Sequence, residues 1–149
     1  MRFFPLLFAA VLLLLSCGPK ATTLEDFNTT DLTLPGGQII KVETMLDTRD
    51  VMRGMMFRTS LAPDRGMLFV HKTAGQNTYW MYQTLIPLDI VWLDKDRRIV
   101  EIVPNAQPCK TEASKCLHYG GHEVAKYVLE ISGGMAQKYN LKLGDLLQF

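Results

Sequence analysis

Apolar and polar positions follow one another along most of the chain with the spacing of short β-strands. Two apolar runs, Leu88–Leu93 and Arg98–Val103, flank the polar residues 94–97 and predict a β-hairpin. Alternation, or a short apolar run between turn residues, predicts further strands at 38–46, 66–71, 124–132 and 145–149. A hairpin alone is only marginally stable, so we expect the remaining elements to cover its apolar face.

Two short helices interrupt this pattern. In residues 48–56 the methionines fall on one helical face, Thr48 can cap the first turn, and Gly54 limits the helix to one or two turns. Residues 135–139 predict a second helical turn. Six or seven short strands with one or two short helices indicate a mainly β (α+β) fold, a compact sandwich or barrel.

The N-terminus has the pattern of a signal peptide. Arg2 precedes the apolar run Leu6–Leu15, which is half as long as the roughly 20 residues that a membrane-spanning helix needs. The sequence Leu14-Leu15-Ser16-Cys17 resembles the bacterial lipobox, which implies cleavage before Cys17 and lipid attachment to that cysteine. An ordinary secretory signal is the alternative. Gly18 follows where a retention signal would carry Asp, so a cell with two membranes is expected to place the protein on its outer membrane, facing the periplasm.

The N-terminal pattern and the charges of the chain predict how the mature protein is organised and which partners it has. We expect a signal peptide at 1–16, a lipidated cysteine with a flexible tether at 17–34, and a single β-rich domain at 35–149. Removing the signal takes away one of 16 basic residues and leaves 15 against 15 acidic ones. Because no basic cluster remains, nucleic acid is not an expected partner, and the expected partners are the lipid bilayer and a small ligand of a monomeric domain.

Two cysteines remain after Cys17 is assigned to lipid. Cys109 and Cys116 form an even pair in an exported protein, and a disulfide between them would stabilise the fold by about 2.5 kcal/mol. The alternative is a Cys2His2 metal site with His118 and His122, but the glycine pair at 120–121 disfavours a helix that presents both histidines. We therefore predict a disulfide, and neither metal nor cofactor.

Four motifs in order resemble the bacterial and archaeal family known as domain of unknown function 192. They are Arg53-Gly54-Met55-Met56-x-Arg58, Gly66-Met67-Leu68-Phe69, Trp80-Met81-x-x-Thr84-x-x-Pro87-Leu88-Asp89 and Tyr127-Val128-Leu129-Glu130. The resemblance runs from about residue 39 to residue 149. It implies a compact, jelly-roll-like β domain that is often exported and has no agreed biochemical activity.

The best polar constellation for a ligand site lies within these motifs. Guanidinium groups bind carboxylates or phosphates bidentately, and an indole stacks on a sugar or another planar group. The candidate ligand-binding residues are Arg53, Arg58, Arg65, Trp80 and Asp89. The competing interpretation is structural: one arginine pairs with Asp89 internally while Trp80 packs in the core.

Other chemistries have less support. The methionines suggest a Cu(I) site, but core packing explains their spacing better. No nucleophile or phosphate-loop motif is present, and a hydrolytic carboxylate pair would need Asp89 close to Glu130 or Glu101. We therefore predict a lipid-anchored envelope domain that binds a small anionic or carbohydrate ligand without catalysis. The alternatives are a hydrolase acting on envelope glycans and a protein-interaction module.

Overall fold

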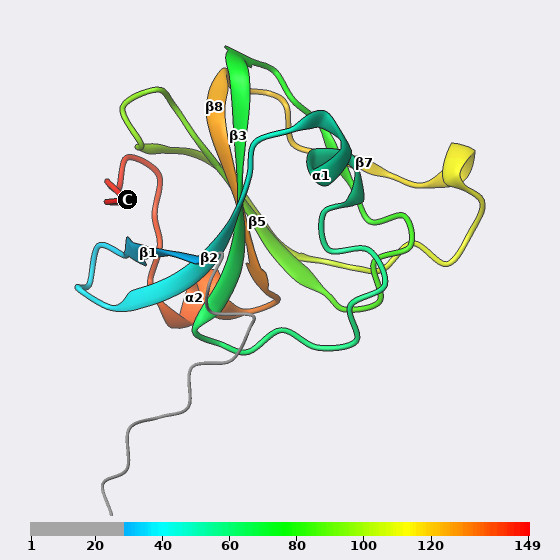
Figure 1. The fold of residues 1–149 in the computed structure, drawn as a ribbon, viewed down its shortest axis with the longest axis horizontal. Coiled ribbons are helices and arrows are strands. Elements are labelled where there is room, and N and C mark those ends of the chain that lie inside the picture. The colour runs from blue at the N-terminus through cyan, green and yellow to red at the C-terminus, as the bar shows by residue number, and fades with distance from the viewer. Residues whose placement is uncertain (1–28) are drawn as a thin grey trace, which may run out of the picture.

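The computed structural model describes residues 29–149, and these form a six-stranded mixed sheet, a two-stranded sheet and short helices (Figure 1). The strands of the main sheet are β1 (Thr29–Thr33), β2 (Ile39–Met45), β3 (Arg65–Gly75), β5 (Leu88–Leu93), β6 (Ile99–Ala106) and β8 (Ala125–Ser132). Their order is β1-β2-β3-β8-β5-β6, in which β2 and β3 are parallel and all other neighbours are antiparallel.

The remaining elements lie between these strands along the chain. They are α1 (Thr48–Arg53), β4 (Tyr79–Trp80), the 3-10 helix η2 (Ala113–Lys115), β7 (His118–Tyr119) and α2 (Met135–Lys138). The predicted mainly β fold, the β5–β6 hairpin and the two short helices are confirmed. The barrel alternative is wrong, because no strand pairing within residues 29–149 joins β1 to β6.

Both ends of the predicted domain need correction. Thr29–Thr33, expected within the tether, pairs with β2 as the edge strand β1 and buries Leu32. The expected closing strand at 145–149 forms only isolated bridges, from Gln148 to Thr33 and from Leu146 to Arg98. The predicted signal peptide and Cys17 lie outside the described residues. No helix between residues 29 and 149 is long and apolar enough to cross a membrane.

The main sheet is covered on both faces. All six residues of β5 are buried, and because side chains alternate along a strand, Val91 and Leu93 join one core cluster while Ile90 and Trp92 join the other. The first cluster includes residues of α2, and the second includes Met55, which follows α1. We call these two sides of the sheet the α2 face and the α1 face.

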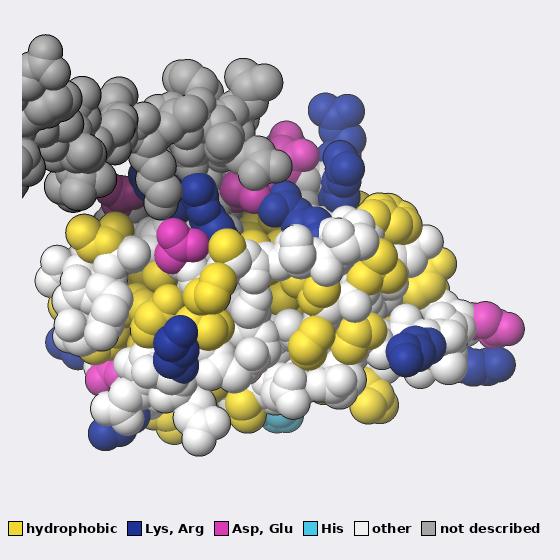
Figure 2. Space-filling model, turned by 90° about the horizontal axis from the view of Figure 1, so that it is seen from below, with side chains coloured by type: hydrophobic (Ala, Val, Ile, Leu, Met, Phe, Trp, Pro, Cys, Tyr) yellow, Lys and Arg dark blue, Asp and Glu magenta, His cyan; other side chains and the backbone are white. Residues whose placement is uncertain are grey.

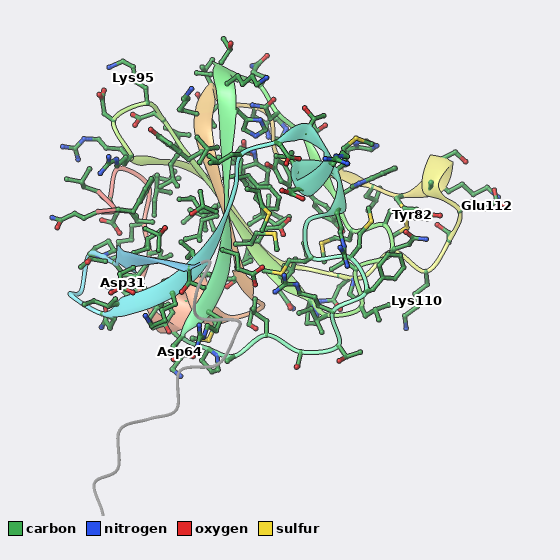
Figure 3. All side chains as sticks on the ribbon, viewed as in Figure 1. Asp31, Asp64, Tyr82, Lys95, Lys110 and Glu112 are labelled. Carbon is green, nitrogen blue, oxygen red and sulfur yellow. A yellow bond between two sulfur atoms is a disulfide. The ribbon has the colours of Figure 1, made fainter. Side chains whose placement is uncertain are left out.

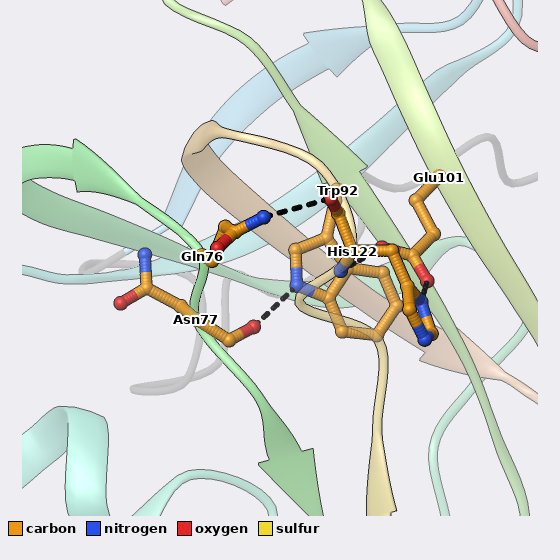
Figure 4. Close-up of polar contacts among 5 residues, drawn as sticks. All are labelled: Gln76, Asn77, Trp92, Glu101 and His122. Carbon is orange, nitrogen blue, oxygen red and sulfur yellow. Dashed lines mark hydrogen bonds and ion pairs between the residues drawn. The ribbon is translucent and has the colours of Figure 1, made fainter.

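The long loop after β6 is held against the α1 face by Trp92. The indole Nε1 donates a hydrogen bond of 2.8 Å to the carbonyl of Asn77, which lies in the segment between β3 and β4 (Figure 4). In the loop after β6, a Cβ on Gly120 would lie 2.2 Å from the same ring. Gly120 also has a φ of +66°, which favours glycine. The predicted disulfide from Cys109 to Cys116 closes the loop. The loop is therefore held by its close contact with Trp92 of the sheet and by the disulfide.

Candidate functional site

Helix α1 begins and ends in a way that brings it close to the sheet. The side chain of Asp47, rather than the predicted Thr48, caps the helix by accepting hydrogen bonds from the amides of Arg49 and Asp50 at 2.9 and 3.0 Å. The helix ends at Gly54, where a Cβ would lie 3.3 Å from the Phe69 ring. This close approach places the motif after Arg53 directly over β3.

Two adjoining hollows open beside α1. The α1 groove has a volume of about 620 Å³, and its lining includes Glu43, Asp50, Arg53, Met56, Arg58 and Met67. The Glu130 cavity has a volume of about 40 Å³, and its lining includes Arg53, Met55, Phe69, Trp80, Thr84 and Glu130. Arg53, Gly54 and Met56 line both hollows, so the two form one continuous candidate site.

Arg58 lies between two glutamates of this site. It binds both carboxylate oxygens of Glu43 at 2.5 and 2.6 Å. In the register of the sheet, Glu43 lies opposite Met67, which in turn lies opposite Glu130. The two carboxyl groups therefore stand on one face, two strands apart, and the positive charge of Arg58 acts to lower the pKa of Glu130. Arg58 is engaged by Glu43 rather than presented to a ligand as an open fork.

Glu130 is the unusual member of the site. Its residue is 4% exposed, and its Oε2 has no hydrogen-bond partner among the described residues. Burial raises the pKa of Glu130 to about 8 despite the opposing effect of Arg58. The carboxyl is therefore largely protonated and neutral at pH 7. A buried acceptor left without a partner costs about 1–3 kcal/mol, so this group is not explained by stability.

A tyrosine and a histidine stand beside the buried glutamate. Tyr79 lines the same cavity and shares a hydrogen bond of 3.1 Å with Nε2 of His71. Burial raises the pKa of Tyr79, and the charge of Glu130 adds to the shift. Burial likewise lowers the pKa of His71, with a smaller effect from Lys126. Both side chains therefore stay neutral at pH 7.

An aromatic cluster forms the outer rim of the cavity. The Trp80 residue is 37% exposed, and its ring centroid lies 5.3 Å from that of Tyr82 and 5.8 Å from that of His118. Strand pairing between β4 and β7 sets Trp80 opposite His118. Tyr82, labelled in Figure 3, forms an isolated β-bridge with Cys109 of the disulfide loop. Trp80 is thus not a core residue, and the alternative prediction that it packs in the core is wrong.

Asp89, by contrast, does not belong to the site. It is fully buried and accepts hydrogen bonds from the amides of Asn105, Gly134 and Ala136 at 2.7, 3.0 and 2.6 Å. Its partners are backbone amides of β6 and of the start of α2, not an arginine, so both sequence-based roles for Asp89 are wrong. Its charge could be recognised from the sequence, but its partners come from segments distant along the chain.

The proposed hydrolytic carboxylate pair is also excluded by the register. Asp89 lies opposite Ile131 and Ile90 lies opposite Glu130, so the two acids point to opposite faces of the sheet. Glu101 is bound to His122, with 2.6 Å between Oε1 and Nδ1, and this contact raises the pKa of His122 (Figure 4). Asp89 therefore cannot flank a bond together with Glu130, and the carboxylate of Glu101 is engaged by His122.

The other predicted residues fall at different places. Arg53 and Arg58 line the α1 groove, and Arg53 and Trp80 line the Glu130 cavity. Arg65 begins β3 and lines neither hollow. Residues that the predicted site lacked are Tyr82, Thr84, His118 and Glu130. A single acid inside the apolar strand at 124–132 was the sequence signal that could have indicated Glu130 as the buried member.

The metal alternatives find no geometric support. Cys109 and Cys116 are joined as a disulfide, and His118 and His122 contact Trp80 and Glu101 respectively. Across residues 29–149, no group of three or more His, Cys, Asp or Glu side chains is arranged to hold a metal ion. Several methionines are core residues, namely Met55, Met67 and Met81.

Comparison with known proteins identifies the family. The model of DUF192, described as "Uncharacterized ACR", matches residues 31–149. No curated protein matches the chain. A solved structure of a protein of unknown function from Novosphingobium aromaticivorans is similar, with 28% identity, a TM-score of 0.76, and coverage of 90% of this chain and 94% of that one.

A second similar structure comes from Sinorhizobium meliloti, where the protein was proposed to be a transcription regulator. It has 32% identity and a TM-score of 0.69, and the match covers 79% of this chain and 89% of that chain. The agreement of the family model with the structural similarity extends over the whole described domain. The chain therefore belongs to the DUF192 family.

Proposed function

We propose that this protein is a lipid-anchored domain of the cell envelope that binds a carbohydrate on its α1 face, without catalysing a reaction. One observation carries the proposal: an exposed indole, flanked by two further rings, lines a cavity together with Glu130, a buried acid whose Oε2 has no hydrogen-bond partner among residues 29–149. Aromatic faces pack against the apolar side of a sugar ring, and a buried polar group recognises a hydroxyl.

The charges of the groove favour a neutral ligand over an anion. Glu43 and Asp50 balance Arg53 and Arg58 along its lining, and the Arg58 fork is already bound by Glu43. Bidentate recognition of a phosphate or carboxylate requires an open guanidinium fork. An anionic ligand would thus compete with the Arg58–Glu43 pair, whereas a sugar needs only hydrogen-bonding groups and an aromatic surface.

The wider surface is in keeping with a small neutral ligand. The face drawn in Figure 2 carries basic, acidic and apolar side chains side by side, without a broad area of one charge. The full chain has a formal net charge of +1. A nucleic-acid partner would normally be marked by a basic surface. These observations support the exclusion of polyanions from the proposal.

The envelope location is proposed from the N-terminal sequence. The lipobox-like Leu14-Leu15-Ser16-Cys17 supports acylation of Cys17, and a disulfide between Cys109 and Cys116 is typical of exported proteins. Intact mass of the protein purified from membranes should show a diacyl or triacyl modification on residue 17, and Cys17→Ala should abolish it. Unmodified protein recovered from the cytosol would contradict this part of the proposal.

Carbohydrate binding can be tested by titration. We expect methyl glycosides of D-glucose, D-galactose, D-mannose and N-acetyl-D-glucosamine, or their short oligomers, to include at least one ligand that quenches Trp80 fluorescence. Trp80→Ala should weaken its binding at least about tenfold, since stacking contributes roughly 1–3 kcal/mol per ring by analogy with base stacking. Leu143→Ala, an exposed apolar residue outside the site, is the matched control.

Two outcomes would contradict the proposal. If no glycoside binds in this titration, or if Trp80→Ala binds as tightly as the Leu143→Ala control, the aromatic rim is not a sugar-binding surface. Recovery of the bound saccharide unchanged after prolonged incubation is expected, because Glu43, the other carboxyl group on this face near Glu130, is bound to Arg58 through both of its oxygens. Released product would instead favour the hydrolase alternative.

A further inference from the structure

The Glu130 cavity has an exposed rim and a buried floor. At its rim the Met52 residue is 70% exposed and Trp80 is 37% exposed, whereas Met55, Phe69 and Glu130 at its floor are buried. Its volume of about 40 Å³ is room for roughly two or three groups the size of a water molecule. A substituent of two heavy atoms can therefore enter, but a whole sugar ring cannot.

The floor has a specific chemical requirement. Glu130 presents a carboxyl oxygen with no partner in a lining that is otherwise mostly apolar and aromatic. A neutral carboxyl both donates and accepts a hydrogen bond, and a hydroxyl offers the same two functions in return. A methylene group beside that hydroxyl would contact the apolar walls formed by Met55 and Phe69. The complementary group is a hydroxyl on a short apolar stem.

Other occupants fit less well. A cationic amine would approach Arg53, which lines the cavity, and Arg58, whose charge acts on Glu130. An anion would have to compete with Glu43 for the guanidinium group of Arg58. A methyl group would fill the space but would leave Oε2 without a hydrogen-bond partner. The hydroxyl-bearing group is thus selected by both charge and hydrogen bonding.

We propose that the Glu130 cavity holds the exocyclic hydroxymethyl group of a hexopyranose whose ring lies on Trp80, with the hydroxyl exchanging hydrogen bonds with the Glu130 carboxyl. This inference rests on the proposed carbohydrate function and specifies which sugars fit. Hexoses and hexosamines that keep the 6-hydroxyl are ligands, and 6-deoxy sugars and pentoses are poor ones. Trp80 supplies the surface for the ring, and Glu130 selects the substituent.

The test compares sugars that differ only at this substituent. Calorimetric titration with methyl glycosides of D-glucose, D-galactose and N-acetyl-D-glucosamine is paired with their 6-deoxy counterparts and with methyl D-xyloside. The full-length protein should bind the hydroxymethyl member of at least one pair about tenfold or more tightly than its 6-deoxy partner, as expected for one lost hydrogen bond to a buried group. The xyloside should bind as weakly as the 6-deoxy sugar or more weakly.

A variant then assigns the discrimination to the proposed residue. Glu130→Met replaces the carboxyl with an apolar group of similar length, so it should bind the hydroxymethyl and 6-deoxy glycosides equally. Its affinity for the 6-deoxy glycoside should match that of the wild type, which shows that the ring surface is intact. If Glu130→Met does not fold, the comparison of sugars on the wild-type protein still decides.

The possible failures can be told apart. Glycosides that bind with a dependence on Trp80 but without discrimination at the 6-position would overturn this inference and leave the carbohydrate function standing. Discrimination that survives in Glu130→Met would place the 6-hydroxyl elsewhere and overturn the inference as well. If no glycoside binds at all, both the proposed function and the inference are wrong.

Discussion

The two faces of the sheet each bury one carboxyl group, and they treat it in opposite ways. On the α2 face, Asp89 accepts hydrogen bonds from three backbone amides. On the α1 face, Glu130 lies one strand away with an oxygen that has no partner. Buried polar groups are normally satisfied, so the first acid is explained by folding and the second is not. The comparison separates a residue that holds the structure together from one that we propose contacts a ligand.

The same contrast extends to the surroundings of each acid. The amides that bind Asp89 come from Asn105 in β6 and from Gly134 and Ala136 at α2, so this one side chain joins distant parts of the chain. Glu130 is surrounded instead by a small open cavity and by side chains at an exposed aromatic rim. Asp89 is thus enclosed by backbone amides, whereas Glu130 lies at a cavity that opens beside an exposed aromatic rim.

The largest expected effect on stability comes from replacing Asp89 by the neutral and isosteric Asn, and the same kind of change at Glu130 is its comparison. Asp89→Asn replaces one acceptor oxygen by an amide donor that faces other donors, so we expect a loss of about 4 kcal/mol in the free energy of unfolding. Glu130→Gln removes no hydrogen bond made by Oε2, and it also removes the cost of holding a proton that the unfolded chain releases, so at pH 7 this variant should be at least as stable as the wild type. Urea unfolding of both variants measures the difference, and similar losses would erase the distinction between the faces.

The disulfide gives the next largest effect, and it acts on the α1 face. Replacing Cys109 and Cys116 together by Ala should lower the free energy of unfolding by about 2.5 kcal/mol, as expected from the entropy of the short loop. Because Tyr82 bridges to Cys109, hydrogen exchange should rise around the aromatic rim but not around Asp89. An equal rise in hydrogen exchange on both faces of the double variant would show that the disulfide does not stabilise the aromatic rim selectively.

A pH effect of intermediate size follows from Glu130. Its pKa is raised from 4.5 to about 8 in the folded protein, so the folded state keeps a proton that the unfolded chain releases between these pH values. Stability therefore falls as the pH rises, by roughly 2 kcal/mol between pH 6 and pH 8 from this group alone. Glu130→Gln should remove that difference, while other titrating groups, including His122, contribute equally to both proteins. Parallel stability profiles for the two proteins would argue against a buried neutral carboxyl.

The smallest effect on stability is expected at the rim. Trp80 is partly exposed, so Trp80→Ala should lower the free energy of unfolding by about 1 kcal/mol or less while it removes sugar binding. The combination of a small change in stability and a large change in affinity distinguishes a binding surface from a packed one. A loss comparable with that of Asp89→Asn would instead make Trp80 a structural residue.

Much of the fold could be predicted because its strands have strong local patterns. The β5–β6 hairpin has two apolar runs around a polar turn, and β5 is buried on both faces, as its continuous run suggests. Strand β1 was missed because Thr29–Thr33 buries only Leu32 and so lacks an apolar period. The segment 145–149 was overpredicted because it forms isolated bridges to two edges of the sheet instead of a ladder.

The site was harder to predict because the register of paired strands, and not the spacing of residues along the sequence, decides which side chains lie together. Arg53, Arg58 and Trp80 of the predicted set line the two hollows beside α1, since Arg53 ends α1, Arg58 follows the helix and Trp80 lies in β4. The hydrolytic alternative paired Asp89 with Glu130 or Glu101, but Asp89 and Glu130 point to opposite faces, and only the pairing of β5 with β8 reveals this. The sequence shows which acids are present, but it does not show which of them has a partner.

The account depends most directly on the protonation of Glu130, which a carbon-13 NMR titration of its side-chain carboxyl measures. Assignment by comparison with Glu130→Gln isolates this resonance from the other acids. We predict a midpoint near pH 8 for the folded protein, as expected for an unpartnered carboxyl held in an apolar floor. A midpoint near the ordinary value of 4.5 would show that the group is ionised and solvated, and would contradict the account.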